Sequence, residues 1–412
     1  MASRLADLSA GLAEMGCEAL LVLARSSQDP DLAPFAGSAH LGECQLVAPR
    51  GGPAHLAYLT AMERDEAAAT GLALITPEDL DLAKRSSEAP EPQDLLAEVA
   101  AKALARVGLA PGRIALAGHG PAGVIQSACA RLTRDGWTFV PGNGLVLILR
   151  KRKTAEELAG IRTAAEGTCA AFRAVARLLA AATVPRATRD SNTGELWLES
   201  EPLRVARLRA EAGEVLSGLG LEQPRGNIIA PAEEGAVPHS TGTPDRILRA
   251  GESLVVDLFP RGTLFADCTR TFCVGPPAPA LARAHAAVRE ALEEAHLRAA
   301  PGTRGWNIQE AVCVRFTAHG YLTPISDPGA TTGYVHNLGH GVGFDLHEQP
   351  IFKKVSGAEG VLREGDVFTL EPGLYDPAEG YGVRLEDLVV LGPEGLESLT
   401  PLPYDLDPRA WE

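Results

Sequence analysis

Two pairs of carboxylates in otherwise apolar segments are the residues of this chain with the clearest potential for chemistry. The first pair, Asp257 and Asp267, lies in segment 251–275, whose two strand-like runs flank a turn and predict a β-hairpin. Folding this segment about Gly262 places Asp257 directly opposite Asp267, where side chains lie about 4.5–5.5 Å apart and like charges repel. Two carboxylates in such strands need a cation, a shared proton or a different strand register. A bound metal is the sharpest of these hypotheses.

The second pair, Glu371 and Glu386, repeats this arrangement in another predicted hairpin. Its strands are segments 367–375 and 382–391, and they place the two glutamates opposite each other. Arg384 shares a strand face with Glu386, because side chains alternate along a strand. One such pair is compatible with an accident or with an arginine-bridged structural cluster. Two pairs indicate a metal site more strongly.

Three histidines lie close together in the glycine-rich segment 333–350, at positions 336, 340 and 347. A lone histidine in a strand is more often a hydrogen-bonded core residue than a ligand. Three of them among glycines, which allow close backbone approach, favour metal ligation or proton transfer. Four carboxylates and one imidazole suit two divalent ions such as manganese, cobalt, iron or zinc. Ions about 3.5–4 Å apart activate a water and polarise a carbonyl, so the predicted reaction is hydrolysis of an amide or a related bond.

The composition is that of an ordinary soluble globular protein of 412 residues, 45% of them hydrophobic and 22% charged. A net charge of −15 and a pI of about 5.2 argue against nucleic acid or an anionic membrane as the main partner. The seven cysteines are scattered without a CxxC motif, which indicates reduced thiols and a cytoplasmic location. We find no signal peptide and no apolar run approaching the roughly 18 residues that span a bilayer.

The first 150 residues predict an α/β domain with a partly parallel sheet, because strand and helix patterns alternate along them. A turn at residues 118–120 lacks both the glycine fingerprint and the lysine of a phosphate-binding loop, so we expect a plain turn. The expected strands are 19–24, 44–48, 55–59, 72–76 and 113–117, with two more within 137–149, and the expected helices are one near residues 5–15, then 94–107 and 122–132.

The domain boundary is expected near residue 150, at a basic run over residues 150–153 that we expect to be a solvated connector. Thr154 and Glu157 form a capping-box pattern that predicts a helix extending to about residue 182. Beyond it we expect a loop at 185–194, helices at 195–218, 280–299 and 306–319, a strand at 226–230, and mainly strands and turns over 324–399.

The motifs DCTRTF, HNLGHGVG and GVRLED surround these candidate residues, and together they resemble the pita-bread metallopeptidases. That superfamily contains methionine aminopeptidase, prolidase, aminopeptidase P and creatinase, and the resemblance covers roughly residues 151–400. It implies a creatinase-type α/β N-terminal domain over 1–150 and an α+β pita-bread catalytic domain over 151–412. The metal ligands that it implies are Asp257, Asp267, His340, Glu371 and Glu386.

The resemblance also implies a role for each residue around the ions. Asp267 and Glu386 would bind both ions, whereas Asp257 and Glu371 would each belong to one ligand set. His239 matches a histidine that lines the substrate pocket, and His336 and His347 match the pair that contacts substrate and stabilises the intermediate. The implied catalytic residues are therefore His239, His336, His347, Glu371 and Arg384, with Glu371 as general acid/base for the attacking water.

The implied function is a dinuclear metal-dependent peptidase that hydrolyses Xaa-Pro bonds, either as a dipeptidase or as an aminopeptidase. Its substrate would be a short peptide with proline after the scissile bond, and its ions most simply Mn2+, with cobalt, zinc or iron as alternatives. The resemblance further implies a homodimer in which the N-terminal domain of one chain closes over the partner's site. One rival is a creatinase-like hydrolase of a small non-peptide C–N bond, and another is a non-catalytic pita-bread binding protein. Either rival should show eroded ligands, and all five are present here.

The sequence departs from the family pattern beside the first ligand. Asp257 and Asp267 are ten residues apart, where these families commonly have eleven. The segment 258–261 (LFPR) replaces the usual small residue and glycine, which brings a bulky Phe259 and an extra cation, Arg261, near the pocket. Both side chains would lie in a solvated turn, or they would alter substrate choice, with Arg261 pairing a substrate carboxylate.

Overall fold

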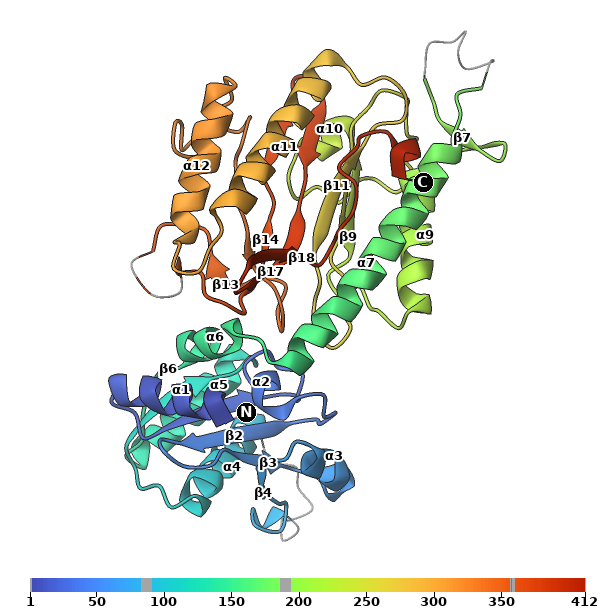
Figure 1. The fold of residues 1–412 in the computed structure, drawn as a ribbon. Coiled ribbons are helices and arrows are strands. Elements are labelled where there is room, and N and C mark those ends of the chain that lie inside the picture. Colours follow the sequence, from blue (N-terminus) through green and yellow to red (C-terminus); the bar gives the residue numbers. More distant parts are fainter. Residues whose placement is uncertain (1, 83–90, 186–193, 356, 358–359, 412) are drawn as a thin grey trace. The chain divides into compact units, whose positions relative to one another are not determined.

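The computed structural model describes residues 2–185 and 194–411, except for 83–90, 356 and 358–359. These residues form two compact units, Met1–Arg150 and Lys151–Glu412. Figure 1 shows the first unit in blue to teal and the second in green to red. Each unit has its own sheets and its own buried core, and each is described separately below.

The first unit is built on a six-stranded sheet in the order β4-β3-β2-β1-β5-β6. The central strand β1 pairs parallel with β5 and antiparallel with β2, so the prediction of a partly parallel sheet is confirmed. The strands are β1 (Ala19–Ala24), β2 (Cys44–Pro49), β3 (His55–Tyr58), β4 (Ala73–Ile75), β5 (Arg113–Ala117) and β6 (Thr138–Pro141).

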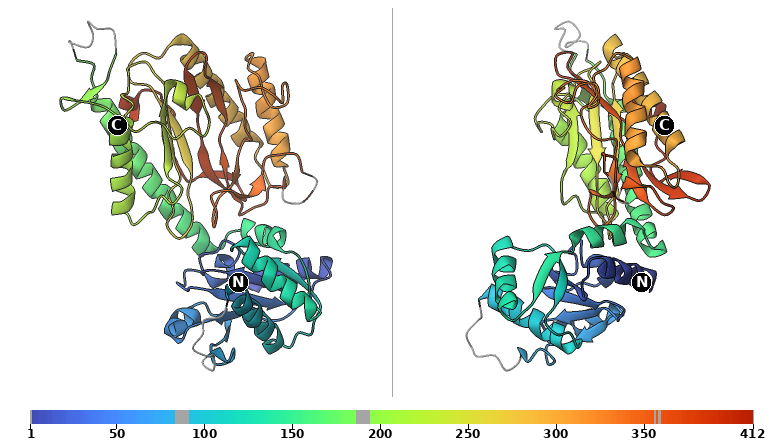
Figure 2. Two further views of the ribbon diagram at one scale, coloured as in Figure 1. Left: turned by 180° about the vertical axis from the view of Figure 1, so that it is seen from behind. Right: turned by 90° about the vertical axis from the view of Figure 1, so that its left-hand side faces the viewer.

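Helices cover both faces of this sheet (Figure 2). Side chains of α1 and α6 join one core with Leu20 and Val22 of β1, whereas α4 and α5 join the other core with Leu21 and Leu23. This division follows from the alternation of side chains along a strand. The helices are α1 (Ala2–Glu14), α2 (Ala33–Ala36), η1 (Ala61–Glu63), α3 (Arg64–Ala69), α4 (Pro92–Arg106), α5 (Ala122–Arg134) and α6 (Asn143–Lys151).

Helix α6 corrects one expectation, because we predicted two strands within residues 137–149 and only β6 forms. The apolar run in α6 is short, and a short apolar run does not distinguish a strand from a buried helix. Val146 and Leu149 are buried at helical spacing, while Ile148 is 43% exposed. The run is therefore one face of an amphipathic helix.

The second unit contains three sheets that matter for the site. Strands β11-β10-β9 form one, β13-β12-β14-β17-β18 form another, and β15-β16 form a two-stranded ladder. The strands are β7 (Trp197–Leu198), β8 (Glu201–Pro202), β9 (Asn227–Pro231), β10 (Leu254–Leu258), β11 (Cys268–Phe272), β12 (His340–Gly341), β13 (Glu348–Ile351), β14 (Val367–Leu370), β15 (Gly373–Asp376), β16 (Tyr381–Arg384), β17 (Asp387–Gly392) and β18 (Gly395–Ser398).

Long helices flank these sheets. The capping box at Thr154 and Glu157 is present and begins α7, while α11 and α12 bury their apolar faces against the sheet residues Phe368 and Val389. The helices are α7 (Ala155–Ala181), α9 (Val205–Gly218), α10 (Ala232–Gly235), α11 (Pro279–Arg298), α12 (Gly305–Ala318) and η4 (Pro408–Trp411).

The helix expected over residues 195–218 begins only at Val205. The first part of this segment forms β7 and β8 instead, joined by a turn in which Glu199 and Ser200 have positive φ angles. Pro202 also lies in this stretch and would break a helix interior. The loop expected at 185–194 falls almost entirely outside the described residues.

The basic run at 150–153 is not the solvated connector that we expected. Lys151 is 4% exposed and its Nζ lies 3.1 Å from Asp366 Oδ2. The Nζ of Lys153 lies 2.5 Å from Glu348 Oε1, and both of these side chains are buried. Buried charges need partners of opposite sign, and these lysines find them on distant segments of the second unit.

Two expectations from composition can be compared with the structure. All seven cysteines are free thiols, as predicted from their spacing. Within the described ranges, no helix combines the length and the apolar character required to cross a bilayer.

Candidate metal centre

The first carboxylate pair lies on β10 and at the start of β11, in a register that differs from our prediction. Asp257 pairs with Thr269, so Asp267 is not directly opposite Asp257. The reason is the turn, in which Arg261 bridges Phe265 and which is therefore centred on Thr263 instead of Gly262. Because the register shift is two residues, Asp267 keeps the strand face of Thr269, which is also the face of Asp257.

The second pair lies in a gap between two ladders. Leu370 pairs with Asp387 in β14–β17, and Gly373 pairs with Arg384 in β15–β16, in one continuous register. That register sets Glu371 opposite Glu386, as predicted. The free backbone N–H of Glu371 donates to Leu338 O (2.7 Å), and that of Glu386 donates to Thr269 O (3.0 Å). These two backbone hydrogen bonds connect the hairpin to the histidine-rich segment and to β11.

Four of the five predicted ligands come together at this gap. Asp267, His340 and Glu386 each offer a ligand atom, and these atoms lie within 4.8 Å of one another. The Nε2 of His340 is 3.4 Å from Glu371 Oε1 and 3.7 Å from Asp267 Oδ2. Asp257, the fifth, is close enough for its charge to raise the pKa of Glu386.

Three carboxylate oxygens of this group are buried without a hydrogen-bond donor in the described part of the chain: Asp257 Oδ1, Asp267 Oδ1 and Glu386 Oε1. The residues that carry them are 8%, 4% and 1% exposed. Burying a charged oxygen without a partner is costly. A cation bound among these oxygens removes that cost, so the donor set fits divalent metal ions.

The pKa shifts of the group also favour a bound cation. Burial, and then repulsion from neighbouring carboxylates, raises the pKa of Asp267 and of Glu371 well above the ordinary value. Burial and the charge of Asp257 raise the pKa of Glu386 to about 8. Burial lowers the pKa of His340 to about 3, so its imidazole is neutral, the form that binds metal.

Arg384 connects one ligand to the residues around it. Its guanidinium donates to Asp257 Oδ2 (2.7 Å), Thr269 Oγ1 (3.0 Å), the Tyr375 hydroxyl (2.9 Å) and Pro238 O (3.2 Å). With only 3% of its surface exposed, it is a fixed cation beside the carboxylates. The resemblance set Arg384 beside the last predicted ligand, Glu386, whereas in the structure its guanidinium pairs with the first, Asp257.

The three other predicted histidines surround the same group. The His336 Nε2 lies 3.0 Å from the Tyr375 hydroxyl and its Nδ1 lies 2.7 Å from Asn337 O, and burial lowers its pKa to about 3. The His347 ring packs edge-on against His340, with centroids 4.2 Å apart. His239 is exposed, and its charge lowers the pKa of both His336 and His347, which places it near both.

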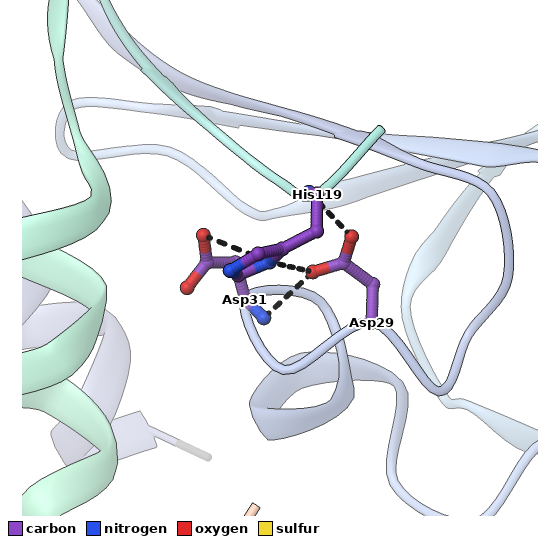
Figure 3. Close-up of side chains that lie close together, drawn as sticks. All are labelled: Asp29, Asp31 and His119. Carbon is purple, nitrogen blue, oxygen red and sulfur yellow. Dashed lines mark hydrogen bonds and ion pairs between the residues drawn. The ribbon is translucent and has the colours of Figure 1, made fainter. Parts of the chain in front are cut away.

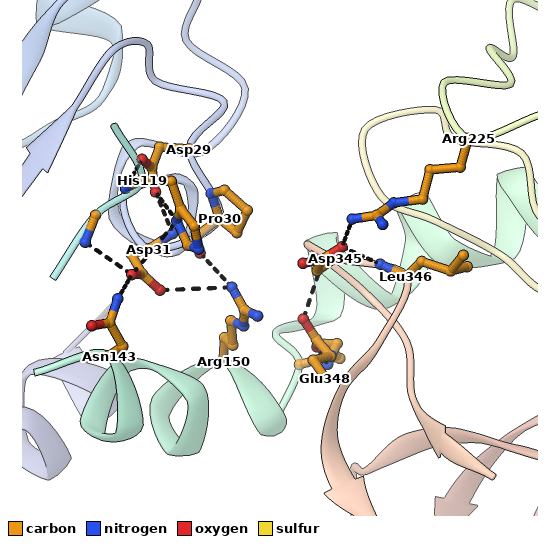
Figure 4. A network of polar contacts seen from close by, with 12 residues as sticks. Asp29, Pro30, Asp31, His119, Asn143, Arg150, Arg225, Asp345, Leu346 and Glu348 are labelled. Atoms are coloured by element: carbon orange, nitrogen blue, oxygen red, sulfur yellow. Dashed lines mark hydrogen bonds and ion pairs between the residues drawn. The ribbon is translucent and has the colours of Figure 1, made fainter. Parts of the chain in front are cut away.

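A network of contacts holds the loop that carries His347 (Figure 4). Arg225 Nη2 lies 2.6 Å from Asp345 Oδ1, and the same oxygen accepts from the N–H of Leu346 (2.8 Å). The N–H of Asp345 donates to Glu348 Oε2 (3.3 Å). The residues on both sides of His347 are therefore anchored.

Phe259 and Arg261 do not lie in a solvated turn together. Phe259 is 9% exposed, so that expectation is wrong for it. Arg261 is half-buried, and its guanidinium lies over the Phe265 ring at 5.4 Å from the centroid.

Sequence reasoning missed Thr269 and Tyr375. Thr269 Oγ1 donates to Glu386 Oε2 (2.7 Å), and the Tyr375 hydroxyl lies between Arg384 and His336. The available signal was strand periodicity. Side chains two or four positions apart lie on the same face of a strand, and Thr269 is two residues after Asp267 while Tyr375 is four after Glu371.

Sequence reasoning also missed a second acid and histidine group, in the first unit (Figure 3). Asp29, Asp31 and His119 offer ligand atoms within 4.8 Å of one another. Asp29 Oδ1 accepts from Asp31 N (2.9 Å) and lies 3.1 Å from His119 Nδ1, and Asp29 Oδ2 accepts from His119 N (2.7 Å). Asp31 Oδ2 accepts from the N–H of Gly118 and from Asn143 Nδ2 (2.9 and 2.6 Å).

This group forms a network of hydrogen bonds within the first unit, which we interpret as structural. The remaining oxygen, Asp31 Oδ1, lies 3.8 Å from Arg150 Nη1, so every carboxylate oxygen of the group has a donor or a cation near it (Figure 4). Gly118 has a φ of +109°, and a Cβ there would lie 2.2 Å from Leu23 O, so the turn requires glycine. Backbone N–H groups of residues 118 and 119 bind the two aspartates, and the absence of phosphate binding at this turn stays a prediction.

Comparisons with known proteins bear on the whole arrangement. A sequence model of metallopeptidase family M24 matches residues 159–393. The "Xaa-Pro dipeptidase" of Pyrococcus furiosus is 33% identical over 212 residues, which are 50% of this chain and 56% of that protein. The "Probable dipeptidase PepE" of Mycobacterium tuberculosis is 30% identical over 205 residues, 49% of this chain and 51% of that protein. The chain spans about half the length of these curated relatives.

Solved structures match over a longer range. The prolidase from Pyrococcus horikoshii OT3 superposes with a TM-score of 0.73 at 22% identity, covering 98% of this chain and 99% of that one. The dipeptidase PepE from Mycobacterium ulcerans gives a TM-score of 0.71 at 23% identity, covering 98% and 96%. These likenesses show the fold, and the expected α/β domain followed by a pita-bread domain is confirmed.

Proposed function

The chain belongs to metallopeptidase family M24, and from this premise we propose that it is a metal-dependent peptidase that hydrolyses Xaa-Pro bonds of short peptides. The observation that carries the proposal is the set of three buried carboxylate oxygens that have no donor among the described residues and lie around a neutral His340. The names of the relatives, Xaa-Pro dipeptidase and prolidase among them, support the choice of bond.

We assign two divalent ions to this site, held by Asp257, Asp267, His340, Glu371 and Glu386. Such ions, when bound, acidify a water and polarise the scissile carbonyl. Manganese is our first choice, because carboxylate oxygens dominate the donor set. Four carboxylates balance the charge of two such ions.

The remaining residues supply proton transfer and orientation. Glu371, whose pKa burial raises, is the general acid/base: it takes the proton of the attacking water and returns it to the leaving amine. His347 and His239 have exposed rings that can donate to the peptide. His336 differs, since both its nitrogens are bonded within the chain. It contacts substrate only after it exchanges its bond to Tyr375.

The wider setting of the enzyme belongs to the same proposal. We propose a cytoplasmic homodimer in which the N-terminal unit of one chain closes over the site of the other. The free cysteines and the acidic composition support the location. The resemblance to prolidase and aminopeptidase P supports the assembly.

The test is hydrolysis of an Xaa-Pro dipeptide, an Xaa-Pro tripeptide and an Xaa-Ala dipeptide, each after chelation and again after manganese is restored. We expect cleavage of the proline peptides only with metal, and the ratio of dipeptide to tripeptide rates distinguishes a dipeptidase from an aminopeptidase. A protein that holds two ions yet cleaves none of them contradicts the proposed substrate and favours a non-peptide C–N bond. A protein that binds no divalent ion contradicts the proposal altogether and favours a binding module.

A further inference from the structure

We propose that Thr269 is a positioning residue that orients the carboxylate of Glu386 and directs its free oxygen to the metal ions. This inference rests on the proposed metal centre. Thr269 lies in β11, directly opposite Asp257 in the ladder, and its side chain is fully buried. Thr269 therefore lies beside two of the proposed metal ligands, Asp257 and Glu386, but has no carboxylate or imidazole of its own.

The hydrogen bonds of the Thr269 hydroxyl have a fixed direction. Arg384 Nε donates to Thr269 Oγ1 at 3.0 Å, and a guanidinium donates only and never accepts. The single hydroxyl proton of Thr269 is therefore available for Glu386 Oε2, at 2.7 Å. Arg384 thus orients the hydroxyl, and the hydroxyl in turn holds one oxygen of Glu386.

The other oxygen of Glu386 is left open by this arrangement. Glu386 Oε1 is buried and has no donor among the described residues. The backbone of Glu386 is fixed by the same threonine, since its N–H donates to Thr269 O at 3.0 Å. One residue therefore restrains both the main chain and the carboxylate of a ligand, and the free rotation of the carboxyl group is lost before any ion binds.

Thr271 provides a matched control in the same strand. It is also a buried threonine, 1% exposed, and it lies on the same strand face two residues further on. Its hydroxyl donates to Arg384 O and accepts from Arg384 N, both at 3.0 Å. The two threonines differ in that the hydroxyl of Thr269 bonds to side chains of the site, whereas that of Thr271 bonds to backbone.

The experiment compares Thr269→Val, Thr269→Ser and Thr271→Val in the full chain, and its first readout is manganese affinity and stoichiometry by calorimetry. Loss of a group that orients a metal ligand typically weakens metal binding by about 10–100-fold. We expect that loss, for at least one of the two ions, in Thr269→Val and not in Thr271→Val. Thr269→Ser keeps the hydroxyl, so its affinity should stay close to wild type.

Thermal unfolding of each variant separates positioning from simple destabilisation. If Thr269→Val does not fold, Thr269→Ala is the alternative. It removes the hydroxyl without placing a methyl group against the polar partners, and the same loss of affinity is expected. Wild-type manganese affinity in a folded variant without the hydroxyl would overturn the inference, as would equal losses in Thr271→Val. A wild-type protein that binds two ions but cleaves no Xaa-Pro peptide removes the proposed substrate and leaves the affinity comparison intact. A wild-type protein that binds no manganese overturns both.

Discussion

The molecule contains two groups of aspartate or glutamate with histidine, and they differ in what surrounds the oxygens. Asp29, Asp31 and His119 lie on loops of the first unit, and N–H donors from backbone and side chains reach their carboxylates. Asp267, His340 and Glu386 lie at strand ends of the second unit, where buried oxygens have no donor in the described chain. Both groups satisfy the same distance criterion for metal binding. Proximity alone therefore does not distinguish the two groups, whereas the buried oxygens without a donor among the described residues do.

The largest expected effect comes from removing a carboxylate from the group of Asp267, His340 and Glu386. Asp267→Ala should release metal and lower kcat/KM by at least about three orders of magnitude, because metal ions contribute several kcal/mol of transition-state stabilisation. Metal analysis and Xaa-Pro hydrolysis measure it. Turnover close to wild type in this variant is incompatible with a dinuclear site.

His347→Ala tests a residue that contacts this group and that we propose is not a metal ligand. It should keep both ions and lose about 10²–10³-fold in kcat, since it removes a donor to the transition state and not a ligand. Steady-state kinetics and metal content are the measurements. If metal is lost instead, the roles of His340 and His347 are misassigned.

The first group should respond in stability and not in metal content. Asp31→Ala leaves the N–H of Gly118 and the amide of Asn143 without their acceptor, which should cost about 1–3 kcal/mol. Denaturant unfolding measures the change, and Asp31→Asn, which keeps an acceptor, is the control. A drop in bound manganese would contradict the distinction between the two groups.

The smallest effect is a pH dependence of the metal-free protein. Glu386 has a pKa of about 8 in the folded chain against an ordinary 4.5, so the folded state holds a proton that the unfolded state has lost. Glu386 should therefore lower stability as pH rises from about 4.5 to about 8, by at most about 1.4 kcal/mol per pH unit for one group, and the fall should be visible above about pH 6.5.

The buried histidines do not contribute to the pH dependence of stability above about pH 6.5. His336 and His340 have pKa values lowered to about 3, so they favour stability as pH rises only up to their ordinary value of 6.5. Thermal unfolding after chelation checks the slope, and Glu386→Gln should reduce it. A stability that rises with pH above 6.5 would show that Glu386 does not hold its proton in the folded, metal-free chain.

Much of the fold was predictable from local pattern. Strands β1 and β5 match their predicted limits, and the capping box at Thr154 begins α7 as expected. The failures are at places where local pattern is ambiguous. The register of β10 and β11 depends on where a turn is centred, and a shift by two residues leaves the alternation of side chains unchanged.

The site was predictable in its charged residues and not in its neutral ones. Carboxylates and histidines in apolar strands are conspicuous, so the five candidate ligands could be named from the sequence, and four of them lie together in the structure. Thr269 and Tyr375 are ordinary strand residues, and their roles arise only when Arg384 reaches them from another strand. The Asp29 and His119 contact joins loops 90 residues apart and leaves no periodic signal.

The gap between the two ladders of the second hairpin has an evolutionary consequence. Ladders on both sides of Glu371 and Glu386 fix these residues, and the turn after Asp376 lies beyond the last pair. Insertions and deletions in that turn should therefore be neutral for the site, and the Glu371–Glu386 interval should vary freely among homologues. Asp267 has a ladder on one side only and follows directly from its turn. Length changes there move Asp267, so the Asp257–Asp267 interval should vary less among homologues than the Glu371–Glu386 interval, although at ten residues this chain is already one short of the common spacing.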